Sequence, residues 1–228
     1  MEYYPKGLFR SPKNGHIFIT YMNEEKISVS IVEDLEEIRE ALRELRQETP
    51  PVVTEPVRVR RHLPFARAGG RSLKLDVHEP EAPPADGERR PALVQVHGGG
   101  WVLGYKDRQG QLLMNHLAAR GWVCFNVDYR LRPMATFPDH LVDVKRAIAW
   151  IRDHADDFGI DPDFVAVTGG SARGHLTALT ALTQDDHRYQ PGFEEADTSV
   201  QAAVPFYGVY DFTNRNGAWP EETVPWFL

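Results

Sequence analysis

The sequence predicts an α/β protein whose main domain is built on a mostly parallel, doubly wound sheet. From residue 57 onward, apolar strand-like runs alternate with amphipathic helical stretches, the order that places helices on both faces of a parallel sheet. Two of these runs are followed directly by glycines, and ligands bind such sheets at the carboxyl ends of the strands. The 228 residues are 42% hydrophobic and 26% charged, which is typical of a globular protein.

Each element of this domain has its own signal in the sequence. Residues 57–65 and 72–80 alternate between apolar and polar side chains, as half-exposed strands do. The later strand-like runs are more continuously apolar, as buried strands must be, and the Pro-rich segment 79–91 is a surface connection. The expected strands are 57–65, 72–80, 92–99, 123–130, 164–170 and 202–208, and the expected helices are 110–120, 139–159 and 172–183.

The first 50 residues are predicted to form a small α+β appendage. Residues 16–22 and 27–32 resemble two short strands around a polar turn, and residues 33–48 form a helix with an apolar stripe. This helix either packs on its own hairpin or on the main domain, or serves as a short dimerisation helix. Prolines after residue 48 end the helix, so we predict an appendage at residues 1–50 and the main domain at residues 51–228.

Charge and composition exclude several classes of function. The net charge is −7 and the basic residues are scattered, so the sequence has no basic patch that would bind nucleic acid or an anionic membrane surface. The first residues lack the apolar run of a signal peptide, and no segment reaches the roughly 18 apolar residues of a membrane span, so a cytoplasmic protein is expected. The single cysteine, Cys124, lies in an apolar strand pattern and is expected to be a buried, inert thiol. No motif for a metal or a cofactor is present.

Two glycine-rich stretches at strand ends are the candidate functional site. The first is "HGGGW", residues 97–101, whose glycines allow backbone N–H groups to turn toward a ligand. The second is "VTGGSA", where Gly169 and Gly170 permit a sharp strand-to-helix turn that would expose the hydroxyl of Ser171. A glycine run alone is often a plain turn, and Ser171 alone could be a helix N-cap. Together, at the ends of consecutive strands, they favour an acyl-transfer site.

From about residue 57 onward, the chain resembles the hormone-sensitive-lipase-like carboxylesterases and lipases of the α/β-hydrolase superfamily. The motifs "HGGGW", "DYRLRP" followed by "FP", "VTGGSA" with "GHL", and "FYGVYD" occur in the order found in that family. The resemblance implies that Ser171 is the nucleophile that attacks a small or medium acyl ester. It also implies an oxyanion hole and its loop, with backbone donors at Gly99, Gly100 and Ala172 and loop residues His97 and Gly98.

The first departure from the family pattern is Arg173, which stands where the elbow normally has glycine. Helix and strand pass closely at this position, so an arginine is expected to collide with a neighbouring strand, at a cost of about 1–3 kcal/mol for overpacking. Two alternatives are that the side chain swings out to solvent or that it binds an anionic group of the substrate. Gly174 cannot replace the missing glycine, because its spacing from Ser171 is different.

The second departure is the absence of a recognisable base and acid after the nucleophile. In this fold the acid and then the histidine follow the serine, and the family carries them on loops after two further strands. Beyond the elbow helix the sequence contains one histidine, His187, and a possible acid, Asp211. We therefore expect a C-terminally incomplete hydrolase sheet that lacks the last strands, with impaired activity.

Two other classes of function remain open at this stage. A non-catalytic protein that binds small molecules, as the gibberellin receptors of the same family do, would also fit a retained oxyanion loop without a base. A protein whose N-terminal hairpin and helix recruit a partner is the other alternative. The strand at residues 202–208 would present an unpaired edge if no further strand covers it, and such edges recruit other chains. Self-association through that edge or through the N-terminal segment is therefore expected.

Overall fold

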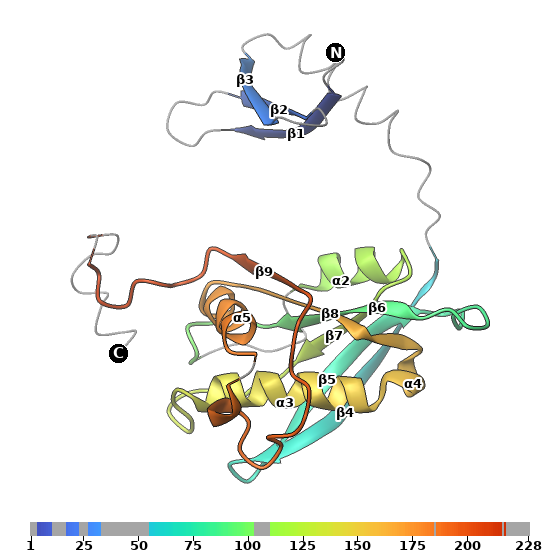
Figure 1. Cartoon of the computed structure of the whole chain (residues 1–228), viewed down its shortest axis with the longest axis vertical. Helices are drawn as coiled ribbons and strands as arrows, with labels where there is room; N and C mark the ends of the chain where they lie inside the picture. Colours follow the sequence, from blue (N-terminus) through green and yellow to red (C-terminus); the bar gives the residue numbers. More distant parts are fainter. Residues whose placement is uncertain are drawn as a thin grey trace. The chain divides into compact units, whose positions relative to one another are not determined.

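The chain divides into two compact units, Met1–Val53 and Thr54–Leu228, as the computed structural model in Figure 1 shows. The structure describes residues 4–10, 17–22, 27–32, 55–102, 110–184, 186–215 and 217. The first unit contains an antiparallel sheet in the order β1-β2-β3. Its strands are β1 (Tyr4–Arg10), β2 (Ile17–Met22) and β3 (Ile27–Val32).

Strands β2 and β3 lie where the sequence predicts a hairpin, and β1 was not predicted. The sequence of β1, "YPKGLFR", contains a proline and a glycine, both of which disfavour a strand. The pairing of β1 with β2 has an irregularity between Pro5 and Gly7, which accommodates them as a bulge would. The helix predicted at residues 33–48 lies outside the described residues.

The second unit contains the predicted α/β sheet, with six strands in the order β4-β5-β7-β6-β8-β9. Strands β7, β6, β8 and β9 are parallel to one another, and β4 and β5 are antiparallel at one end. The prediction of a mostly parallel sheet is thus confirmed. The strands are β4 (Val57–Ala68), β5 (Arg71–Pro80), β6 (Arg90–Val96), β7 (Val123–Val127), β8 (Ile160–Gly170) and β9 (Ala202–Phe206).

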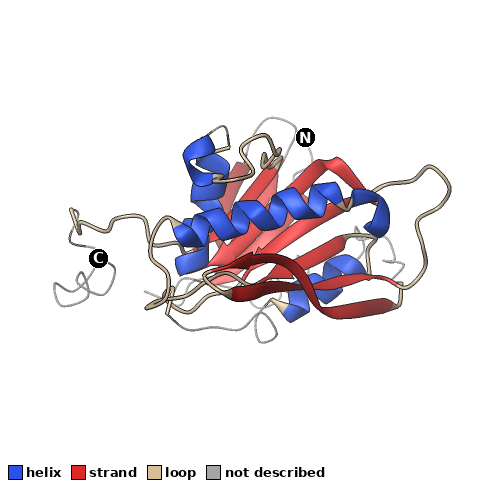
Figure 2. Ribbon diagram, turned by 90° about the horizontal axis from the view of Figure 1, so that it is seen from below, coloured by secondary structure: helices blue, strands red, loops and turns tan. Residues whose placement is uncertain are grey.

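Helices cover both faces of this sheet. Figure 1 shows α2 on one side of the sheet and α3 and α5 on the other, and Figure 2 shows the long α3 lying across the strands. The helical segments are α2 (Gln111–Ala118), α3 (Asp139–Asp153), α4 (Ala155–Phe158), α5 (Ala172–Leu182) and the short 3-10 turn η2 (His187–Tyr189). Within the described residues, no helix combines the length and the apolar character needed to cross a membrane.

The central strands form the core, as their apolar sequences predict. All five residues of β7 are buried, and six of the seven residues of β6 are buried. Strand β5 differs from the expectation of a half-exposed strand, because every residue from Leu75 to Pro80 is buried. The strand is paired on both edges, with β4 and β7, and α2 packs against it, with Nδ1 of His78 2.6 Å from Oδ1 of Asn115. Cys124 is fully buried and free, and burial raises the pKa of its thiol to about 12.

The helix predicted at residues 139–159 is present but is interrupted at His154, between α3 and α4. That residue has a non-helical backbone, with φ of −108° and ψ of 21°. Its Nδ1 lies 2.8 Å from the carbonyl oxygen of Trp150, and its ring stacks on the Trp150 indole. A short α4 follows and ends at Gly159, whose φ of 62° suits glycine. The chain then enters β8 at Ile160, four residues before the predicted start of the strand.

Strand β9 is the last strand in the sheet order and pairs with β8. Val204 and Phe206 of β9 are about half exposed, at 47% and 48%, and Tyr207 just after it is 79% exposed. An exposed apolar edge of this kind favours association with other chains. Self-association through this edge stays a prediction.

Candidate active site

Ser171 lies on a sharp turn between β8 and α5, at the position that the two glycines predict. Its backbone has φ of 62° and ψ of −127°, an unfavourable conformation for a residue with a side chain. Strand β9 stabilises this turn, because the N–H of Ser171 donates to the carbonyl oxygen of Phe206 over 3.0 Å. The Tyr207 ring approaches Gly170 so closely that a Cβ there would lie 2.6 Å from it. A residue with a Cβ at this position would have to displace the exposed Tyr207 ring.

The glycine-rich loop after β6 lies at the same edge of the sheet as Ser171. Strands β6 and β8 are parallel neighbours with Gln95 paired to Thr168, so the residues that follow each strand emerge side by side. Gly99 and Gly100 have φ of 131° and 60°, backbone conformations that side chains rarely adopt. The loop thus has the backbone conformation that allows successive N–H groups to point toward one acceptor.

Tyr129 anchors the beginning of this loop. Its hydroxyl donates to the carbonyl oxygen of His97 over 3.1 Å, and the two rings stack with centroids 4.6 Å apart. Both side chains are buried, with exposures of 4% for Tyr129 and 1% for His97. Burial raises the pKa of the Tyr129 phenol above its usual value, so the hydroxyl keeps its proton and remains a donor. His97 therefore has a structural role in the loop.

The loop that carries Tyr129 is fixed in turn by Arg130. Its Nε and Nη2 donate to the two carboxylate oxygens of Asp143 over 2.8 and 2.9 Å, and its backbone N–H donates to the same carboxylate over 2.9 Å. Asp143 lies on α3 and its side chain is fully buried, while Asp139 gives Arg130 a second, more exposed partner. These contacts fix the loop after β7 to α3.

Arg173 is accommodated inside the site, which differs from the expected collision. The residue is only 8% exposed, so its side chain does not swing out to solvent. Its Nε donates to the carbonyl oxygen of Gly170 over 3.1 Å, and its Nη1 donates to that of Val96 over 3.0 Å. The side chain fits because Gly98 and Gly169 have no Cβ; one added at either would lie 2.4–2.5 Å from Arg173 atoms. Arg173 thereby links the elbow to the end of β6.

We expect Arg173→Gly to destabilise the fold, although glycine is the residue found in the family. The change removes two hydrogen bonds from a charged donor, each worth about 1.5–3 kcal/mol, and adds a helical glycine at about 1 kcal/mol. Removal of the guanidinium also relieves the cost of burying its charge, which opposes part of this loss, so chemical denaturation should show a net loss of about 2–4 kcal/mol in the free energy of unfolding. Arg188→Ala is the control, because Arg188 is 81% exposed and pairs with Asp186. Equal or higher stability of Arg173→Gly would show that the guanidinium is strained.

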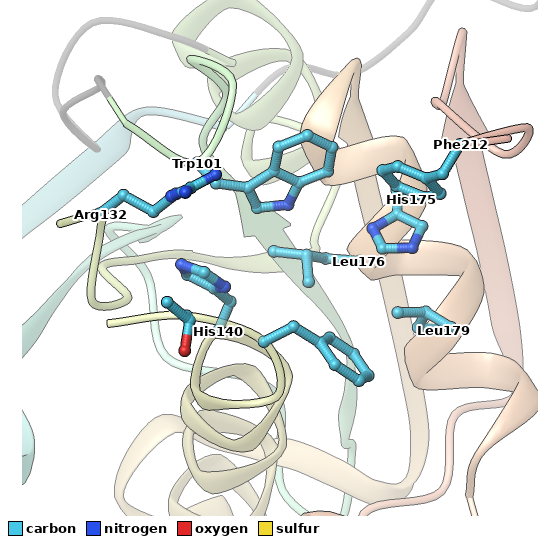
Figure 3. Close-up of a pocket in the computed structure, with 9 residues that line it drawn as sticks. Trp101, Arg132, His140, His175, Leu176, Leu179 and Phe212 are labelled. Atoms are coloured by element: carbon cyan, nitrogen blue, oxygen red, sulfur yellow. The ribbon is translucent and has the colours of Figure 1, made fainter. Parts of the chain in front are cut away.

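A cavity of about 430 Å³ opens beside the elbow, between the first turns of α3 and α5. Figure 3 shows Trp101, which follows the glycine loop, with His140 of α3 on one side and His175 of α5 on the other. Burial lowers the pKa of His140 and, with the nearby His140 adding to the effect, lowers that of His175 to about 4. Both imidazoles are therefore neutral at pH 7. The other lining residues are Arg132, Thr136, Phe137, Leu176, Leu179 and Phe212.

The candidate base His187 is not brought to Ser171 by the described structure. His187 lies in η2, beyond the far end of α5, and the 11 residues of that helix span about 16 Å. Its Nδ1 lies 2.8 Å from the carbonyl oxygen of Glu194. Asp211 accepts a hydrogen bond from the Thr213 hydroxyl over 3.1 Å. The length of α5 therefore separates His187 from Ser171.

Sequence reasoning missed the inward path of Arg173 and the two histidines of the cavity. The path of an arginine side chain depends on the empty space left by glycines from two other segments, which no local pattern reveals. His140 and His175 occur in the "FP" and "GHL" segments, so the motifs marked the right regions without marking these residues.

Comparisons with known proteins agree with this fold. A family model described as BD-FAE matches residues 75–224. The probable carboxylic ester hydrolase LipM of Mycobacterium tuberculosis is 57% identical over 59% of this chain and 31% of its own length. Esterase LipQ of the same organism is 52% identical over 64% of this chain and 34% of its own. The chain thus spans about a third of the length of these two relatives.

A solved structure shows the same fold. Apo esterase 2 of Thermogutta terrifontis superposes with a TM-score of 0.59 at 31% identity, over 76% of this chain and 62% of that chain. The resemblance to hormone-sensitive-lipase-like hydrolases, which the motifs indicated, is confirmed by these relatives. Because the family model covers most of the second unit and its glycine-rich turns, the chain belongs to the BD-FAE family of α/β-hydrolases.

Proposed function

We propose that this chain carries the nucleophile and the oxyanion hole of a serine carboxylic ester hydrolase. The observation that carries the proposal is the backbone of Ser171, which has a positive φ on a strand-to-helix turn. Strain of this kind persists only where the surrounding structure holds it, and it is concentrated at functional sites. A helix N-cap would need no such strain, because an N-cap residue ordinarily adopts an extended backbone.

In the proposed reaction, the Ser171 oxygen forms a bond to the ester carbonyl carbon and its proton passes to a base. The carbonyl π electrons move onto the oxygen, and the backbone N–H groups of Gly99, Gly100 and Ala172 stabilise the resulting oxyanion. Collapse of this intermediate breaks the bond to the alcohol, which leaves with a proton, and water then releases the acid from Ser171. The positive end of the α5 dipole lies at the turn and favours the same negative charge.

The proposed substrate is an ester of a small or medium acyl group. Relatives of this chain are named carboxylic ester hydrolases and esterases. The T. terrifontis esterase 2 has been solved with butyrate bound and in a form phosphorylated by paraoxon. The cavity beside Ser171 has the size and the mainly apolar lining of a small-molecule site. No nucleic acid is proposed as a partner.

We further infer that the 228-residue chain by itself is impaired. The histidines that follow Ser171 in the sequence are His175 and His187. His175 lies in the first turn of α5 and its pKa is lowered to about 4, mainly by burial, which makes it a poor base at pH 7. His187 lies beyond the far end of that helix. The family resemblance places the acid and the base on later loops.

The test is a chimaera in which residues 54–215 are joined to the part of LipM that follows its aligned segment. We expect this chimaera to hydrolyse p-nitrophenyl butyrate at least a thousandfold faster than the same chimaera with Ser171→Ala, since removal of the nucleophile disables the triad. Circular dichroism and gel filtration establish that both forms are folded. Folded chimaeras with equal rates would overturn the proposal.

A non-catalytic protein that binds small molecules is the alternative. The observation that favours it is the cavity, which is formed within the described residues without any triad base. Thermal-shift measurements with hydrophobic esters and acids distinguish the two functions when read beside the chimaera assay. Tight binding of an intact ester by a chimaera that stays inactive would favour the binding protein.

A further inference from the structure

The cavity beside Ser171 is apolar except at a few positions that face one another across it. Trp101, Phe212 and His175 form one wall, with ring centroids 4.8–5.8 Å apart. Figure 3 shows His140 on the opposite side, next to Arg132. His140 belongs to the lining and is only 4% exposed. A ligand that fills the cavity is therefore enclosed between aromatic rings and meets an imidazole.

Both histidines of the cavity carry a buried ring nitrogen without a hydrogen-bond partner in the described part of the chain. The atoms are Nε2 of His140 and Nδ1 of His175. Buried polar atoms in native proteins almost always have a partner, and an unsatisfied one destabilises the folded state. His140 and His175 line the same cavity. We therefore infer that a ligand in this cavity supplies the missing hydrogen-bond partner. The ring of His140 can turn toward such a ligand, since its χ2 preference is broad.

We propose that the cavity binds the part of the substrate that carries a hydroxyl group at some distance from the ester, and that His140 is the specificity-determining partner of this hydroxyl. The proposal rests on the proposed function, because it assumes that an ester reaches Ser171. It goes further because it assigns a hydroxyl group to the part of the substrate that lies in the cavity. The apolar walls alone would predict a hydrocarbon group there.

The chemistry of the lining favours a hydroxyl over a carboxylate. A neutral imidazole has one donor and one acceptor nitrogen, and a hydroxyl can both donate and accept, so it pairs with either tautomer. Burial lowers the pKa of His140, so this residue does not provide a positive charge for an anion at pH 7. Arg132 also lines the cavity, but it is exposed, so water and salt screen its charge and weaken its attraction for a carboxylate.

The test measures binding in the full chain with Ser171→Ala, so that turnover does not interfere. Isothermal titration compares methyl hexanoate, methyl 6-hydroxyhexanoate and the anion of monomethyl adipate. We expect the hydroxylated ester to bind about tenfold more tightly than methyl hexanoate, since a satisfied hydrogen bond replaces an unsatisfied one. In His140→Phe this preference should disappear or reverse. His116→Phe is the matched control and should keep the preference, because His116 is an exposed residue of α2.

A spectroscopic measurement covers the case in which His140→Phe fails to fold. In the 15N-histidine-labelled Ser171→Ala protein, methyl 6-hydroxyhexanoate should shift the Nε2 resonance of His140, and methyl hexanoate should leave it nearly unchanged. Equal affinity for the two esters, tightest binding of the adipate anion, an unchanged preference in His140→Phe, or no binding of any ligand would overturn the proposal. Because all these measurements use an inactive serine variant, their failure is distinguishable from failure of the hydrolase proposal, which depends on the chimaera assay.

Discussion

The 228-residue chain is expected to hydrolyse p-nitrophenyl butyrate no faster than its Ser171→Ala variant. Removal of the base from a serine triad lowers turnover by roughly a millionfold, and the remaining rate comes from the oxyanion hole and substrate binding. His175 has a pKa lowered to about 4, and His187 lies beyond the far end of α5 from Ser171. A Ser171 hydroxyl without a base is a weak nucleophile. A continuous spectrophotometric assay of both forms measures the difference.

Clear Ser171-dependent turnover would contradict this expectation and indicate an unrecognised base. His187→Gln and His175→Gln, each made in the active chain, would then identify it, because only the base should abolish the Ser171-dependent rate. The bell-shaped pH dependence of such a rate would also report the pKa of the group. A base at His175 would remain active down to about pH 4, in keeping with the lowered pKa of that residue.

Asp143→Ala is expected to lower the free energy of unfolding by about 3–5 kcal/mol, because it leaves a largely buried guanidinium without its main partner. The Asp143 side chain is fully buried and that of Arg130 is only 14% exposed. Asp143 accepts hydrogen bonds from the backbone N–H, Nε and Nη2 of Arg130, so its loss also releases the loop after β7. Urea denaturation followed by circular dichroism measures the change.

Asp139→Ala is the matched control for this prediction. Asp139 pairs with the same guanidinium over 3.2 Å, but its side chain is 40% exposed, and exposed ion pairs contribute about 0–1 kcal/mol. A loss below about 1 kcal/mol is therefore expected. Similar effects of the two substitutions would show that burial does not determine the strength of these contacts.

The features that the sequence predicted best are those in which a backbone conformation requires a particular residue. Gly99 and Gly100 have positive φ, and a Cβ at Gly174 of the "GHL" segment would lie 2.6 Å from the backbone oxygen of Phe206. Such demands restrict the residue type at a single position, so glycine patterns could locate both turns. The apolar runs predicted the buried strands for a similar reason, since strands covered on both faces need apolar side chains throughout.

Other features depend on contacts between distant segments, and the sequence could not predict them. The insertion of β7 between β5 and β6 leaves no local pattern, and neither does the packing of α2 on β5. The inward path of Arg173 depends on Gly98 and Gly169, which belong to two separate strand ends. The break at His154 was missed because apolar side chains continue at helical spacing through it, with Ile151, Ala155 and Phe158 all buried.

Mass spectrometry of the chimaera after treatment with paraoxon tests the identity of the nucleophile most directly. A related esterase has been solved in a form phosphorylated by paraoxon, and a serine that attacks an ester carbonyl should also displace p-nitrophenol from this phosphate ester. We expect a diethyl phosphate adduct on the peptide that contains Ser171, and loss of that adduct in Ser171→Ala. An active chimaera that carries the adduct on another residue, or that loses activity without any adduct on Ser171, would contradict the assignment of Ser171 as the nucleophile.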